Sequence, residues 1–82
     1  MSIIPLLAQA AFEPETIDFL VSVYETAWRE VEQSGSKLAS PAYRRAAQEI
    51  IAKRIIENAQ RGERDAKVLA DDAVSFLERS YA

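Results

Sequence analysis

The stretch YRRAAQEIIAKRIIENA, residues 43–59, decides how this chain folds. Its apolar residues recur every three or four positions, which predicts a helix. At about 100° per residue, however, the apolar side changes halfway along the helix. The first group is Tyr43, Ala46, Ala47 and Ile50, and the second is Ile51, Ala52, Ile55, Ile56 and Ala59. A helix in a simple bundle needs one apolar stripe, so the surplus side predicts a further partner.

A preceding helix is predicted over residues 14–33. Pro14 fits the first turn, where its missing N–H leaves no bond unmade. Apolar residues then recur at helical spacing as far as Val31. Gly35 suits the left-handed position that commonly ends a helix, so the chain turns there.

The central and last helices are predicted over about residues 41–61 and 66–80. Ser40 is expected to cap the central helix, with Pro41 at its first position. Gly62 is expected to end it, and Asp65 to cap the last helix. The segment between residues 34 and 40 reads as a short polar connection, and short connections predict antiparallel neighbours.

These elements predict an all-α fold, a three-helix bundle with an N-terminal apolar arm. The arm is residues 1–12 and the helical domain is residues 13–82. A chain of 82 residues buries only about 60–65 per cent of its unfolded surface, so its core is thin. The chain has no cysteine, so no disulfide can reinforce that core.

The composition argues against catalysis. The chain has neither cysteine nor histidine, which removes the commonest nucleophile–base pairs and the commonest metal ligands. Asp71 and Asp72 are adjacent and point about 100° apart on a helix, so they are not expected to hold one metal ion together. Glu49 and Lys53, four residues apart, are expected to form a surface ion pair. We therefore expect no enzyme activity, no catalytic residue, no metal site and no cofactor.

The predicted function is protein–protein interaction or scaffolding, through a homodimer or a complex with another protein. The central helix has a surplus apolar side, and Phe19 and Val23 lie beside the main apolar stripe of the first helix. These apolar side chains would be exposed to water unless a second copy buries them or the arm folds back over them. The predicted interface residues are Ile3, Ile4, Leu6, Leu7, Phe19, Val23, Tyr43, Ala46 and Ile50.

The alternative is a small DNA-associated regulator that uses the basic residues of the central helix. The last two helices have the length of a helix-turn-helix, but Asp71, Asp72 and Glu78 would lie where phosphates bind. The formal net charge of −3 also disfavours DNA. Nucleic acid is therefore not the expected partner.

The N-terminal arm resembles a targeting signal only in part. No Lys or Arg precedes its apolar run, and Ile3 to Ala8 is shorter than a secretory signal requires. No stretch reaches the roughly 20 apolar residues that span a bilayer. The expected location is the cytoplasm.

Residues 13–74 resemble a group of small alphaproteobacterial helical proteins of unknown function. The shared pattern is Glu-Pro-Glu-Thr at residues 13–16, Trp28, Ile56, Ala59, and Gly-Glu-Arg-Asp at residues 62–65, followed by Leu69 and Ala73. The resemblance implies a bacterial helical protein, and it carries no catalytic or binding residue.

Overall fold

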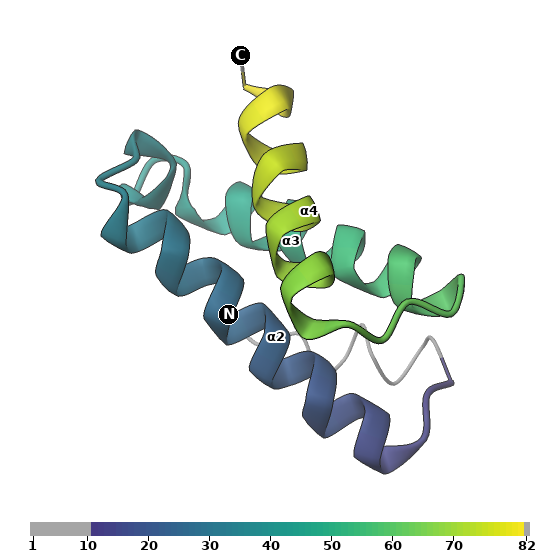
Figure 1. Ribbon diagram of the computed structural model, residues 1–82. Coiled ribbons are helices and arrows are strands. Elements are labelled where there is room, and N and C mark those ends of the chain that lie inside the picture. The colour runs from purple at the N-terminus through teal and green to yellow at the C-terminus, as the bar shows by residue number, and fades with distance from the viewer. Residues whose placement is uncertain (1–10, 82) are drawn as a thin grey trace.

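The computed structural model describes residues 11–81, which form three α-helices and one short 3-10 helix. In chain order they are α2 (Pro14–Gln33), η1 (Lys37–Ala39), α3 (Arg44–Gln60) and α4 (Ala66–Ser80). Residues 11–81 contain no strand, so the predicted all-α three-helix fold is confirmed. Each long helix contacts the other two, and α4 crosses in front of α3 instead of running alongside it (Figure 1). In this crossing the structure departs from the expected antiparallel arrangement.

The bounds of α2 and α4 agree with the predicted ranges because their end signals work as expected. Pro14 opens α2, and Gly35 follows its end in a left-handed conformation, with φ of 71°. At the start of α4, the Asp65 side chain accepts a hydrogen bond from the Val68 N–H at 3.1 Å. These local contacts stop and start helices without help from the rest of the fold.

The start of α3 corrects the prediction. The carbonyl oxygen of Ser40, not its side chain, accepts hydrogen bonds, from the N–H of Tyr43 at 3.1 Å and of Arg44 at 2.8 Å. Pro41 to Tyr43 therefore form a separate turn, and α3 begins at Arg44 with Tyr43 as its N-cap. Ser40 as the N-cap was a wrong prediction.

The polar connection before α3 contains η1, which was not predicted. The Ser36 side chain accepts a hydrogen bond from the Leu38 N–H at 3.1 Å and so begins this short turn. Leu38 is only 5% exposed. The connection therefore adds an apolar side chain to the core instead of only spanning two helices.

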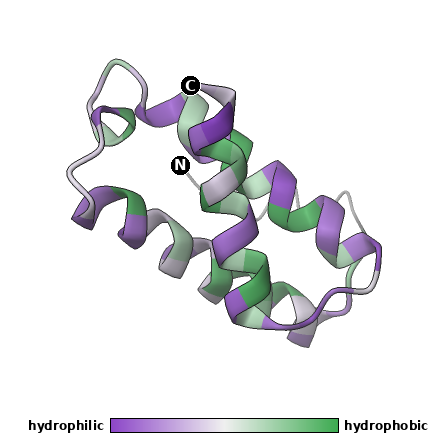
Figure 2. Cartoon of the chain, turned by 45° about the horizontal axis from the view of Figure 1, so that its top comes forward, coloured by the Kyte–Doolittle hydropathy of each residue, from purple (hydrophilic) through white to green (hydrophobic). Residues whose placement is uncertain are grey.

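The core lies where the three helices meet. It is built by Leu20, Val23, Tyr24, Ala27, Trp28, Val31, Leu38, Ala47, Ile51, Ala52, Ile55, Ile56, Ala59, Leu69, Ala70, Ala73 and Leu77. Small alanines stand beside large side chains on α3 and α4, which lets these helices approach closely. Figure 2 shows the connection between α3 and α4 as hydrophilic. Trp28 is only 8% exposed and is the largest side chain in this core.

Candidate protein interface on α3

The predicted interface residues of α2 are covered by the single chain. Val23 is 2% exposed and belongs to the core, so the expectation that it lies beside the buried stripe was wrong. Phe19 is half-buried and packs against the core. The cause is that both α3 and α4 contact α2, which widens its buried arc. Ile3, Ile4, Leu6 and Leu7 lie outside the described residues.

The three predicted residues of α3 and its N-cap all keep part of their surface exposed. Tyr43 is 38% exposed, Ala46 is exposed and Ile50 is half-buried. They are spaced by three and four residues, so they lie on one side of the helix. We call Tyr43, Ala46 and Ile50 the outer strip. Ile50 also packs against the core, so this strip is narrower than the sequence suggested.

Tyr43, at the N-terminal end of the outer strip, makes two contacts through its ring. The ring of Tyr43 meets the ring of Tyr81 edge-on, with 5.9 Å between centroids. The Lys37 ammonium lies 5.9 Å from the centroid of the Tyr43 ring. Tyr81, just after α4, is itself 37% exposed, so it extends the apolar surface beyond α3. Its contact with Tyr43 was not predicted, since it depends on how α4 crosses α3.

A row of alternating charges runs beside the outer strip. Its members are Glu49, Lys53, Glu57 and Arg61, spaced four residues apart. None of them forms an ion pair with another residue in the range 11–81, so the ion pair expected between Glu49 and Lys53 is not formed there. An exposed pair at this spacing contributes only a few tenths of a kcal/mol, too little to hold two mobile side chains together. These charges are consequently available to groups outside the described part of the chain.

A polar network joins α3 to α4 on another side. Arg54 Nε donates a hydrogen bond to Asp72 Oδ2 at 2.6 Å, and Asn58 Nδ2 donates to the same oxygen at 2.6 Å. The Arg54 guanidinium also lies over the Phe76 ring, 4.6 Å from its centroid. The hydrogen bond from Arg54 lowers the pKa of Asp72 below its ordinary value, and the hydrogen bond from Asn58 has a smaller effect in the same direction. This network adds polar contacts between α3 and α4 to those of the hydrophobic core.

One buried hydroxyl in the core has no partner among the described residues. The Tyr24 hydroxyl is enclosed and makes no hydrogen bond. Burial raises the pKa of Tyr24, because a charged phenolate would lose its water there. The positive charge of Arg44 lowers the same pKa, and the negative charge of Glu32 raises it. The hydroxyl therefore lies near the exposed ion pair between Arg44 and Glu32.

The remaining chemistry of the described residues is limited. Residues 11–81 contain no group of three or more Asp, Glu, His or Cys side chains placed to share a metal ion. Within the same range, no helix combines the length and apolar character needed to cross a bilayer.

Comparison of the chain with models of protein families, with curated proteins and with solved structures found no match. The resemblance to small alphaproteobacterial helical proteins and the cytoplasmic location therefore stay predictions.

Proposed function

We propose that this protein is a non-catalytic association module that forms a homodimer through the outer side of α3. The observation that carries the proposal is the outer strip, an exposed apolar surface next to charges without partners in residues 11–81. Apolar side chains on a surface and free charges at its margin are the usual composition of an interface core and rim.

The charge order supports a second copy of this chain as the partner. In a two-fold dimer the same surface meets itself, and two equivalent helices can pair in opposite directions. With the axis near residue 51, Glu49 of one copy faces Lys53 of the partner subunit, and the reverse pair forms as well. The same axis brings Ile50 of the two copies close together. Opposite charges thus meet beside the contact between the two Ile50 side chains.

The size of this surface predicts a weak dimer. The outer strip contributes three side chains, and interfaces well below about 1,200 Å² belong to transient complexes. Apolar burial at about 25 cal/mol per Å² favours association but must offset the lost freedom of two molecules. We therefore expect a dimer that forms at micromolar or higher concentration.

Light scattering on purified protein tests the proposal with the variant Ile50→Glu. Two buried glutamates facing each other near the axis would be strongly unfavourable, so the variant should be a folded monomer where the parent is a dimer. Val68→Glu is the matched control, because Val68 is 47% exposed and lies on α4 away from the outer strip. The proposal fails if Ile50→Glu, folded by circular dichroism, has the same mass as the parent, or if both variants lose the dimer equally.

The charges give less support to the DNA-associated alternative. Arg44 is paired with Glu32, and Arg54 is paired with Asp72, so two basic residues of α3 are already engaged. A mobility shift with duplex DNA at low salt distinguishes the two functions. Association alone predicts no shift, while a shift that disappears with added salt would favour the regulator.

A further inference from the structure

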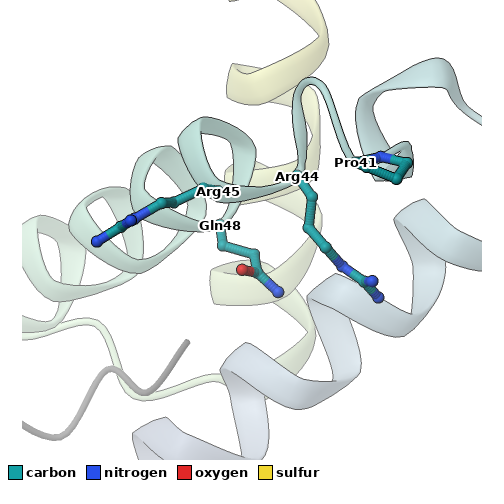
Figure 3. Close-up of a pocket in the computed structure, with 4 residues that line it drawn as sticks. All are labelled: Pro41, Arg44, Arg45 and Gln48. Carbon is teal, nitrogen blue, oxygen red and sulfur yellow. The ribbon is translucent and has the colours of Figure 1, made fainter.

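An open hollow of about 490 Å³ lies beside the start of α3. Its described lining consists of Pro41, Arg44, Arg45 and Gln48. Figure 3 shows Arg44 and Gln48 extending to one side of the helix and Arg45 pointing away from both. The Pro41 ring and the carbon chains of the two arginines make the walls of the hollow largely apolar. An apolar occupant therefore suits these walls.

The hollow lies at one end of a strip that runs the length of α3. Arg45, Gln48, Ala52, Ile56 and Ala59 are spaced by three or four residues, so they share one side of the helix. We call these five residues the second strip. Arg45 is exposed, and the other four are buried. The strip is therefore covered along most of its length and open at the end that borders the hollow.

The last helix, α4, is not positioned to cover the second strip. Arg54, which pairs with Asp72 on α4, lies nine residues after Arg45, and this spacing is about 180° around the helix. The first helix, α2, contacts the side between them, where the Arg44 guanidinium lies over the Trp28 ring. The part of the second strip farthest from α4 is thus left for a further segment of the chain.

The described part of the chain begins near the C-terminal end of the second strip. The Arg64 guanidinium lies 5.7 Å from the centroid of the Phe12 ring, and Arg64 Nη1 donates a hydrogen bond to the Ala59 carbonyl oxygen at 2.6 Å. Phe12 also packs against the core. Ala11 has φ of 59°, which is uncommon for a residue with a Cβ and persists where surrounding contacts hold it. Residues 1–10 therefore join the helical domain close to Ala59.

The length of residues 1–10 matches the length of α3. Ten residues span at most about 33 Å when they are fully extended. The 17 residues of α3 span about 25 Å. A segment that runs back along α3 from its C-terminal end can thus reach the hollow.

The charges on α3 favour the second strip over the outer strip as the path of this segment. Residues 1–12 contain no charged side chain. A path from the C-terminal end of α3 to the outer strip would pass over Glu57 and Lys53, and burying these charges beneath apolar side chains is unfavourable. The second strip offers Ile56 and Ala52 over the same length instead.

We propose that residues 1–10 of the N-terminal arm occupy the second strip and the hollow of their own chain, antiparallel to α3. The strip and the hollow are covered by the apolar residues of this segment, Ile3, Ile4, Leu6 and Leu7. These residues then stabilise the single chain and do not belong to the dimer interface, in which the sequence placed them. The outer strip stays open for a second copy.

Disulfide cross-linking tests this position directly, because the chain has no cysteine of its own. Two double variants are compared, Ile4→Cys with Arg45→Cys and Ile4→Cys with Ala46→Cys. Arg45 and Ala46 are both exposed, but Ala46 belongs to the outer strip. A disulfide needs Cα atoms within about 7 Å, so oxidised glutathione should close the pair at residue 45 about tenfold faster or more. Mass spectrometry of the folded variants at low concentration measures the closure within one chain.

Equal rates, or faster closure at residue 46, would overturn the proposal. Failure of both pairs to close would overturn it too. A covalent dimer formed by the pair at residue 45 would also overturn it, because the arm would then lie on another copy.

A stability comparison within the arm gives a second test that needs no cysteine. Leu7→Asp should lower the midpoint of thermal unfolding by about 5 °C or more, since it places a charge in an apolar contact. Gln9→Asp is the matched control, because it adds the same charge to the arm and should change the midpoint little. An unchanged midpoint for Leu7→Asp, or equal losses in both variants, would overturn the proposal.

Light scattering on Leu7→Asp separates this proposal from the proposed dimer. The variant should associate as the parent does, because the outer strip is unchanged. Loss of a dimer that the parent forms would place the arm in the dimer interface and overturn its position on the second strip. Both the cross-linking and the unfolding midpoint are measured on single chains, so a parent that forms no dimer would contradict the proposed function alone.

Discussion

The two sides of α3 both carry apolar side chains, but these side chains are buried to different degrees. On the inner side, Ile51 and Ile55 are completely buried by the neighbouring helices. On the outer side, Tyr43, Ala46 and Ile50 have only partial cover from their own chain. The same helix therefore contributes stability through one side and carries the surface of the proposed association on the other. Apolar character alone does not distinguish the two sides. What distinguishes them is how many neighbouring helices cover each side.

The largest effect should come from truncating the inner side. Ile55→Ala should lower the free energy of unfolding by about 3 kcal/mol, because it removes buried methyl groups and leaves a cavity. Ile50→Ala on the outer side should lower it by about 1 kcal/mol or less, since Ile50 is half-buried. Urea unfolding followed by circular dichroism at low protein concentration measures both. Equal losses would contradict the distinction between the two sides.

The loss predicted for Ile55→Ala is large relative to the roughly 5–10 kcal/mol of a small domain. If that variant does not fold, Ile55→Val replaces it, with an expected loss of about 1 kcal/mol. The corresponding Ile50→Val should then be close to neutral.

An intermediate effect is expected at the network between α3 and α4. Asp72→Asn should lower the free energy of unfolding at neutral pH by about 1 kcal/mol, because it weakens the ion pair with Arg54. The folded pKa of Asp72 lies below its ordinary value of 3.8, so this contribution is complete above that pH and is lost as the pH falls further. The stability difference between parent and variant should therefore shrink below about pH 4.

Unfolding curves of parent and Asp72→Asn at several pH values measure that difference. Asp71→Asn is the control, since Asp71 is paired only with the exposed Lys67 and should change little. A difference that persists unchanged to the lowest pH at which both variants fold would rule out the Asp72 carboxylate as its source.

The smallest effect on stability should come from the end of the outer strip. Tyr43→Ala removes the edge-on contact with Tyr81 and should lower the free energy of unfolding by about 0.5 kcal/mol. The same variant should weaken the dimer, because Tyr43 is 38% exposed and belongs to the proposed interface. Thermal unfolding and light scattering measure the two properties separately. A stability loss as large as that of Ile55→Ala would mean that Tyr43 belongs to the core.

The parts of the fold that depend on local signals were predictable from the sequence. Pro14, Gly35 and Asp65 act on backbone groups a few residues away, so the bounds of α2 and α4 followed from them. The start of α3 was misplaced because Ser40 offers two acceptors, and the backbone carbonyl, not the hydroxyl, takes the bonds.

The candidate sites were less predictable because they depend on how helices cross. Val23 is buried beside residues of α4, and no spacing within α2 reveals that neighbour. The contact of Tyr43 with Tyr81 and the pair of Arg54 with Asp72 join residues far apart in the sequence. The surplus apolar side of the central helix could be predicted, but its width could not.

Sedimentation equilibrium across micromolar to millimolar concentration tests the central claim most directly, using the parent and two charge variants. The parent should rise from the 9.2 kDa of one chain toward twice that mass. Glu49→Lys should stay monomeric, because it places like charges together across the axis, and the double variant Glu49→Lys with Lys53→Glu should regain the dimer. A parent that keeps the mass of one chain at every concentration would contradict the account, and so would a dimer that Glu49→Lys leaves intact.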